Sequence, residues 1–369
     1  MTDNRIIELH DEQGQSAWLD NLKRGYITSG RLVEFRDDGI RGLTSNPSIF
    51  QKAIQDSSDY DDQFAELRAS GASIDDSYWA MVTQDIHGAC DVFSKVYDHS
   101  DGVDGYVSVE VDPSLAHDGP GTEQAARHLH ETIDRRNLMV KIPATAEGVA
   151  PIEHMIAEGR CINVTLIFSL DRYAEVIEAY ISGLERLARD PGADLSRVAS
   201  VASFFISRVD TEVDKRLEAI GTGQALDLRG KAAVAQGKLA YELFVESFFG
   251  PRWDALAERG ARVQRPLWAS TSTKNDAYPD TLYVDELIGP RTVNTLPEAT
   301  LEAFADHGTV VRRVDEDIDD ARAVWLSLAD VGVDMNDVAA QLEREGVASF
   351  ATSFDELLAA LEAKAAELA

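Results

Sequence analysis

Short strand-like segments alternate with longer helical patterns along most of this chain. The short segments are rich in apolar and β-branched residues, and the stretches between them carry apolar residues at helical spacing. Such alternation predicts parallel strands joined by crossover helices. Eight strand–helix units in 369 residues are typical of a closed (β/α)8 TIM barrel, which is the predicted fold. The predicted strands are residues 16–20, the first half of 40–50, 105–111, 138–142, 161–168, 198–205, 265–269 and 291–295.

The alternative to a barrel is an open, doubly wound α/β sheet. Sheets of that kind often carry a G-x-G-x-x-G turn after the first strand, but residues 18–22 (WLDNL) contain no glycine. A single barrel domain spanning residues 1–369 is therefore favoured, with residues 1–15 as a polar N-terminal extension. Residues 315–369 are rich in Ala, Leu and Glu and are predicted to pack on the barrel as helices, with a solvated or coiled-coil tail as the alternative.

The chain is strongly acidic, with a formal net charge of −30. Nucleic acids and anionic membrane surfaces would repel such a protein, so neither is an expected partner. Residues 1–15 lack the apolar core of a signal peptide, and no run of about 18 apolar residues follows, so we expect a cytoplasmic location. Cys90 and Cys161 are too few for a disulfide framework of the secreted kind and are predicted to be small buried side chains.

No metal site or cofactor-binding motif is evident in the sequence. The eight histidines lack the spaced carboxylate or cysteine partners of a zinc site. His128 and His130 lie two residues apart on a predicted helix, face different directions and are predicted to be surface residues. No G-x-S-x-G motif is present, and neither cysteine lies in a nucleophile motif. No metal ion and no cofactor are therefore expected.

A lysine lies in the middle of the fourth predicted strand. The segment 137–145 (NLMVKIPAT) reads as a strand buried on both faces, with Lys141 inside it. A buried lysine is usually paired or uncharged, and an uncharged lysine in a dry pocket can form a Schiff base with a ketone. The alternative is that Lys141 lies at a frayed strand end and reaches water with its ammonium group. The segment alone does not decide between the two.

Polar side chains follow or end nearly all of the predicted strands. In a (β/α)8 barrel the active site forms at the C-terminal ends of the strands, so these side chains are expected to meet. Together they suit the formation of a carbanion next to a carbonyl, with a lysine as electron sink and carboxylates moving protons. The residues are Asp20, Thr44, Asn46, Glu110, Lys141, Thr145, Asn163, Thr165, Ser203, Arg208, Ser270 and Asn294.

An ordered set of motifs in this chain resembles those of transaldolases, in particular the longer bacterial type. The motifs are GLTSNPS at 42–48, VSVEV at 107–111, VKIPAT at 140–145, CINVTLIFS at 161–169 and SFFISRVD at 203–210, with 268–275 and 283–295 as further marks. The similarity extends from about residue 18 to residue 304. It implies a (β/α)8 barrel that transfers a dihydroxyacetone unit between sugar phosphates without a metal.

The resemblance assigns four catalytic residues. Lys141 matches the lysine that forms the Schiff base, and Asp20 matches the aspartate that transfers protons at the end of the first strand. Glu110 matches the glutamate that positions a catalytic water together with Thr165.

The resemblance also implies a set of substrate-binding residues. Asn46 and Asn163 match asparagines that bind hydroxyls of the dihydroxyacetone unit. Ser203 matches a substrate-contacting serine, and Arg208 matches the phosphate-binding arginine. Phe205 is predicted to shape the sugar channel, or else to be an ordinary core aromatic.

The second half of the phosphate site departs from the pattern of shorter family members. Those members place a serine and an arginine two residues apart after the seventh strand, whereas 270–274 (STSTK) offers no arginine. Ser270 is retained, and Lys274 is the predicted replacement, as a point charge without the bidentate geometry of arginine.

Three functions are compatible with these residues. The leading one is a transaldolase that converts sedoheptulose 7-phosphate and glyceraldehyde 3-phosphate to erythrose 4-phosphate and fructose 6-phosphate. The others are a simple aldolase of the fructose 6-phosphate aldolase kind, whose chains are much shorter, and a non-catalytic barrel that binds sugar phosphates. The expected partners are small sugar phosphates, and the sequence leaves open whether the protein is a monomer or a homodimer.

Overall fold

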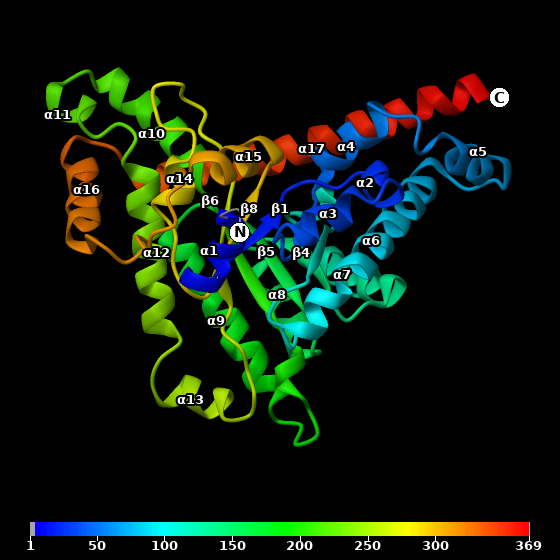
Figure 1. Cartoon of the computed structure of the whole chain (residues 1–369), viewed down its shortest axis with the longest axis horizontal. Coiled ribbons are helices and arrows are strands. Elements are labelled where there is room, and N and C mark those ends of the chain that lie inside the picture. The colour runs from blue at the N-terminus through cyan, green and yellow to red at the C-terminus, as the bar shows by residue number, and fades with distance from the viewer. Residues whose placement is uncertain (1–3, 369) are drawn as a thin grey trace.

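A computed structural model describes residues 4–368 and contains a closed barrel of parallel strands (Figure 1). The strands follow one another around the barrel in chain order, and β1 pairs with β8 to close it. This closure confirms the predicted (β/α)8 fold and excludes the open sheet. The strands are β1 (Gln15–Leu19), β2 (Leu43–Thr44), β3 (Val107–Glu110), β4 (Leu138–Pro143), β5 (Ile162–Ile167), β6 (Ser200–Phe205), β7 (Arg265–Ala269) and β8 (Thr292–Leu296).

The helices pack around the barrel (Figure 1). Those in the first half are α1 (Arg5–Gln13), α2 (Arg24–Thr28), α3 (Arg31–Asp37), α4 (Pro47–Gln55), α5 (Asp61–Ala69), α6 (Ile74–His99), α7 (Gly119–Ile133), α8 (Val149–Ala157) and α9 (Leu170–Leu187). The others are α10 (Ile206–Ile220), α11 (Gly223–Leu226), α12 (Ala232–Ser247), α13 (Pro251–Ala257), α14 (Leu282–Asp285), α15 (Glu298–His307), α16 (Ile318–Asp330) and α17 (Met335–Leu368).

The polar segment before β1 contains a helix that sequence reasoning did not predict. Asn4 caps α1 by accepting hydrogen bonds from the backbone N–H groups of Ile6 and Ile7. Ile6 and Leu9 are buried, because α1 presents one apolar stripe to the rest of the protein. Arg5 donates hydrogen bonds to two backbone carbonyls at the end of α15, 2.7 and 2.8 Å away. The two apolar positions were too few to stand out in a mainly polar segment.

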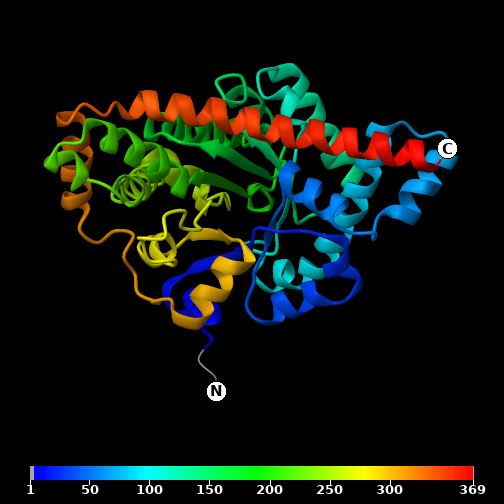
Figure 2. The same ribbon diagram turned by 90° about the horizontal axis from the view of Figure 1, so that it is seen from above.

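The C-terminal segment is helical, as predicted, and its last helix passes over the C-terminal ends of the strands. Figure 2 shows α17 (red) as one long helix along the side of the molecule opposite α1. It contacts α4, α6 and α10, which flank the C-terminal ends of the strands, and also β5. The preceding helix, α16, packs against α12 on the outside.

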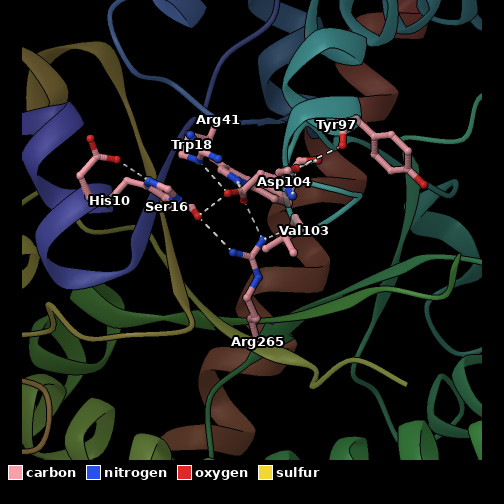
Figure 3. Close-up of polar contacts among 10 residues, drawn as sticks. His10, Ser16, Trp18, Arg41, Tyr97, Val103, Asp104 and Arg265 are labelled. Atoms are coloured by element: carbon pink, nitrogen blue, oxygen red, sulfur yellow. Dashed lines mark hydrogen bonds and ion pairs between the residues drawn. The ribbon is translucent and has the colours of Figure 1, made fainter. Parts of the chain in front are cut away.

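A buried charge network fills the N-terminal end of the barrel (Figure 3). Asp104, which precedes β3, is 1% exposed and lies 2.9 Å from Arg265 and 2.7 Å from Arg41. Ser16 donates to the same carboxylate, and Trp18 Nε1 lies 3.4 Å from it. Burial raises the pKa of Asp104, but the two arginines outweigh burial and bring it down to about 2. The network joins the starts of β1, β2, β3 and β7.

Two predictions about single side chains have different outcomes. Cys90 and Cys161 are both buried, as predicted. His128 is exposed, as predicted. His130 is half-buried on α7, so the prediction of a surface position is wrong in part for this residue. Burial, with the charge of Arg160, lowers the pKa of His130 to about 4.

Candidate active site

One cavity at the C-terminal end of the barrel brings most of the predicted site residues together. Two predicted site residues, Glu110 and Asn163, do not line the cavity but contact residues that do. Glu110 pairs with Lys141, and Asn163 accepts a hydrogen bond from Ser203. The residues that line the cavity are Asp20, Thr44, Asn46, Lys141, Thr165, Ser203, Phe205, Arg208, Ala269, Ser270, Ser272, Lys274, Thr295, Pro297 and Phe350.

Lys141 is buried and paired, not frayed toward water. β4 lies between β3 and β5, so Lys141 faces Glu110 on one side and Asn163 on the other. Its Nζ lies 3.0 Å from Oε2 of Glu110, and the two side chains are 5% and 4% exposed. Nζ also donates a hydrogen bond to the carbonyl of Ser45 at 3.1 Å. The alternative of a solvent-reaching lysine is therefore excluded.

Glu110 is a carboxyl group that can hold a proton in this setting. Burial raises its pKa, the adjacent Lys141 lowers it, and the charge of Asp20 raises it, with a net shift upward. A glutamate with a raised pKa beside an amine is suited to exchange protons with it.

Asp20 follows β1 and is held by a chain of two threonines. Thr44 on β2 donates to Oδ1 of Asp20 at 2.7 Å, and its hydroxyl lies 2.6 Å from that of Thr295 on β8. Burial raises the pKa of Asp20, whereas the Thr44 hydrogen bond and the charges of Lys141 and Lys274 lower it; the net shift is upward. Neighbouring strands thus aim the carboxylate into the cavity.

Two asparagines are fixed by hydrogen bonds that leave part of each amide free. Asn46 is the N-cap of α4, where its Oδ1 accepts the N–H of Ile49 at 3.0 Å, and Pro47 starts the helix. Asn163 on β5 accepts from Ser203 at 2.7 Å and donates to Ser108 at 3.0 Å. These contacts hold Asn46, Asn163 and Ser203 in defined orientations.

Backbone irregularities lie at the ends of two site strands. Leu166 has φ of 59°, and the pairing of β5 with β6 shifts register between Val164 and Ile167. Ser270, directly after β7, has φ of 55°. Left-handed conformations cost energy for residues with a side chain and gather at functional sites. The neighbouring hydroxyl of Thr165 is buried without a hydrogen-bond partner in the described structure, so it is available to a ligand or a water molecule.

Two cationic side chains, Arg208 and Lys274, line the cavity. Arg208 lies in the first turn of α10, and its guanidinium carbon is 5.2 Å from the centre of the Phe205 ring. Burial lowers the pKa of Arg208, and burial with the charges of Arg208 and Lys52 lowers that of Lys274. Lys274 donates to Ser272 at 2.6 Å, and Ser270 lies 3.0 Å from Ser207. The charge of Arg208 thus disfavours the charged form of Lys274, and an anionic ligand between them would relieve this repulsion.

Other polar residues at strand ends have structural contacts. Thr145 donates to the carbonyl of Ala116 at 2.5 Å, and Asn294 accepts from Thr271 at 2.9 Å. Neither lines the cavity. Conversely, Thr295 and Phe350 line it and were not among the predicted site residues. Thr295 could have been found as the polar end of β8, whereas nothing in the sequence indicated that residue 350 would reach the barrel mouth.

Neither a metal site nor a membrane-spanning helix is found in residues 4–368. No group of three or more His, Cys, Asp or Glu side chains among them is arranged to hold a metal ion. None of the helices described is long and apolar enough to cross a membrane.

The sequence is similar to a known family over nearly its whole length. The sequence model of the family Transaldolase/Fructose-6-phosphate aldolase matches residues 17–361. A transaldolase of Saccharopolyspora erythraea is 52% identical over 360 residues, covering 97% of each chain. A transaldolase of Acidothermus cellulolyticus is 53% identical and covers 94% of each chain. One from Mycobacterium tuberculosis is 52% identical, covering 94% of this chain and 93% of the relative. The protein belongs to the transaldolase/fructose-6-phosphate aldolase family.

Proposed function

We propose that the protein is a transaldolase that works through a Schiff base on Lys141. The observation that carries the proposal is the buried amine 3.0 Å from Glu110, inside a cavity that Asp20 also lines. The reaction moves a dihydroxyacetone unit from sedoheptulose 7-phosphate to glyceraldehyde 3-phosphate, giving erythrose 4-phosphate and fructose 6-phosphate. Similarity to transaldolases along nearly the whole chain supports the same activity.

The first half of the reaction forms the iminium ion. Glu110 takes a proton from the ammonium of Lys141, and the free amine attacks the C2 ketone of the substrate. Proton transfer through Glu110 and a water held by Thr165 then removes the carbinolamine hydroxyl as water. The contact of Glu110 with Nζ and the unpartnered hydroxyl of Thr165 support these roles.

The second half breaks and remakes a carbon–carbon bond. Asp20 takes the proton of the C4 hydroxyl, the C3–C4 bond breaks, and its electron pair moves into the iminium to give an enamine on Lys141. The aldehyde that carries C4 leaves. An acceptor aldehyde is then attacked by the enamine, Asp20 returns the proton to the new alkoxide, and hydrolysis of the iminium releases the ketose.

The remaining site residues bind the rest of the substrate. Asn46, Asn163 and Ser203 suit the hydroxyls of the three-carbon unit, because each is fixed by a hydrogen bond. Arg208, Lys274 and Ser270 suit the phosphate group, since all three line the cavity and the charge of Arg208 acts on Lys274. Phe205 also lines the cavity, beside Arg208. A cytoplasmic location and assembly as a monomer or homodimer stay predictions.

Trapping of the intermediate tests the proposal directly. Borohydride added with fructose 6-phosphate should reduce the iminium to a secondary amine and add the mass of the three-carbon unit, or of the whole sugar phosphate, to the peptide that carries Lys141. Peptide mapping by mass spectrometry locates the modification. The same treatment without sugar is the control. Modification of another lysine instead, in an active preparation, would remove Lys141 from the mechanism.

A fructose 6-phosphate aldolase is the competing activity, because the family includes both. A transaldolase retains the dihydroxyacetone unit until an aldehyde accepts it, so free dihydroxyacetone should be released from fructose 6-phosphate far more slowly than transfer to erythrose 4-phosphate occurs. Equal rates with and without the acceptor would identify a simple aldolase.

The variant Thr44→Val should move the pH dependence of the reaction. The Thr44 hydrogen bond lowers the pKa of Asp20, so its removal raises that pKa further. Asp20 acts as a base in its ionised form, and the acidic limb of kcat/KM for the ketose should therefore shift to higher pH. A profile of the variant that superimposes on the wild type would separate Thr44 from the titration of Asp20.

A further inference from the structure

The buried face of α17 lacks a side chain at one position, Gly346, close to where the helix passes over the cavity. Residues at four-residue spacing along a helix lie on one face. On α17 they are large and apolar at Val338, Leu342, Phe350 and Phe354, and all four are buried. Gly346, also buried, is the exception. Glycine weakens a helix interior relative to alanine, so its presence in this row calls for a local reason.

The guanidinium of Arg208 lies beside this position. A Cβ atom placed on Gly346 would lie 3.5 Å from Nη1 of Arg208, 3.0 Å from Cδ2 of Leu166 and 3.6 Å from Cε2 of Phe168. The absent side chain therefore lets the α17 backbone approach both Arg208 and the irregular end of β5. One turn further along, Phe350 lines the cavity itself. The same face of α17 thus forms part of the cavity wall at Phe350 and lies beside Arg208 at Gly346.

Two neighbours restrict the space around Arg208. The carbon of its guanidinium lies 5.2 Å from the centre of the Phe205 ring. Its Nη1 lies 3.5 Å from the position that a Cβ atom of Gly346 would take. Glu345, the neighbour of Gly346, is exposed. Its negative charge raises the pKa of Arg208, whereas burial lowers that pKa by more. A guanidinium restricted by packing loses little freedom when an anion binds, which strengthens that binding.

We propose that Gly346 is a positioning residue for the phosphate end of the substrate: it keeps clear the space beside Arg208 that any side chain longer than a methyl group would fill, so the guanidinium keeps the orientation that binds the phosphate group. This rests on the proposed transaldolase function. Gly346 contacts no substrate atom itself and acts through Arg208. The C-terminal helix is accordingly part of the substrate-binding site and not only a cover for the barrel.

Two substitutions of different size separate this role from a general effect on the helix. In Gly346→Ala the new methyl group requires only that the end of the Leu166 side chain move by a few tenths of an ångström. In Gly346→Leu three further carbons occupy the space in front of Arg208 and displace its guanidinium. Ala348→Leu is the matched control, because residue 348 is exposed on the same helix, two residues away.

The measurement compares a phosphorylated acceptor with its unphosphorylated counterpart, erythrose 4-phosphate with erythrose, at saturating fructose 6-phosphate. The transfer proceeds through a covalent enamine on Lys141, so kcat/KM for the acceptor reports only the steps from attack on the acceptor to release of the new ketose. Gly346→Leu should lower kcat/KM for erythrose 4-phosphate about tenfold, mainly through KM, which is the scale of one weakened charge-assisted hydrogen bond. For erythrose the value should change less than about twofold, and Gly346→Ala and Ala348→Leu should behave nearly as wild type.

The double variant Gly346→Leu/Arg208→Ala provides the sharper test. Once Arg208 is absent, leucine at 346 should cause no further loss with erythrose 4-phosphate. Equal losses with both acceptors, or additive losses in the double variant, would overturn the positioning role and indicate general damage to the fold. Failure of the proposed function gives a different result, because the wild-type protein would then transfer the three-carbon unit to neither acceptor.

Discussion

Replacement of Lys141 by alanine should lower kcat for transfer by about 10⁴-fold or more, because the covalent route and its electron sink are lost together. The fold should persist, since Glu110, which then lacks its partner 3.0 Å away, can bind a proton instead of remaining charged. Burial raises its pKa and Lys141 lowers it, so removal of the lysine moves the pKa further upward. Single-turnover measurements with fructose 6-phosphate and erythrose 4-phosphate, with circular dichroism for the fold, test this expectation.

The chain offers a matched control in another buried lysine. Lys238 is 7% exposed, donates to the carbonyl of Glu316 at 3.1 Å and lies 3.7 Å from Glu286, away from the cavity. Lys238→Ala should lower stability and leave the transfer chemistry intact. Lys141→Arg keeps a positive charge beside Glu110 but cannot form an iminium ion, so it should be as inactive as Lys141→Ala. Turnover of either Lys141 variant within tenfold of wild type would contradict the mechanism.

The sequence was sufficient to predict the barrel because the strands are buried on both faces. Every residue of β4 and β5 is buried, so these strands read as nearly continuous apolar runs. The polar residues inside such runs then stand out. Parallel closure places all strand ends on one face, and this is why Asp20, Lys141 and Ser203, far apart in the chain, could be predicted to meet.

Features that depend on approach between distant elements could not be predicted. Phe350 and Gly346 lie in a segment whose composition indicates a helix but not the place where it crosses the barrel. The hydrogen bond between Thr44 and Thr295 joins residues 251 positions apart through closure of β1 between β2 and β8. The left-handed conformations of Leu166 and Ser270 carry no sequence signal either, because neither residue is glycine, asparagine or aspartate.

Replacement of Asp104 by asparagine should destabilise the protein by about 3–5 kcal/mol, since it leaves the buried Arg265 and the half-buried Arg41 without their counter-charge. Both carboxylate oxygens of Asp104 accept hydrogen bonds: one from Ser16 and Arg41, the other from Arg265. Asparagine offers one oxygen, and its NH₂ group would face donors at the other position. Urea unfolding followed by circular dichroism measures the change in free energy. The active cavity lies at the other end of the barrel, so kcat of the folded variant should stay close to wild type.

The pKa of about 2 for Asp104 adds a pH dependence that separates its charge from its shape. A carboxyl group whose pKa is lower in the folded state stabilises the fold above its ordinary pKa of 3.8, and this contribution is lost as pH falls toward 2. The stability difference between wild type and Asp104→Asn should therefore be constant above about pH 5 and shrink below about pH 4. Asp37→Asn is the control, because Asp37 pairs with Arg36 with its side chain 63% exposed, and such surface pairs contribute about 1 kcal/mol or less. A difference for Asp104→Asn that stays constant down to the acid-unfolding range would mean that the carboxylate acts through its shape and hydrogen bonds, and not through its charge between the two arginines.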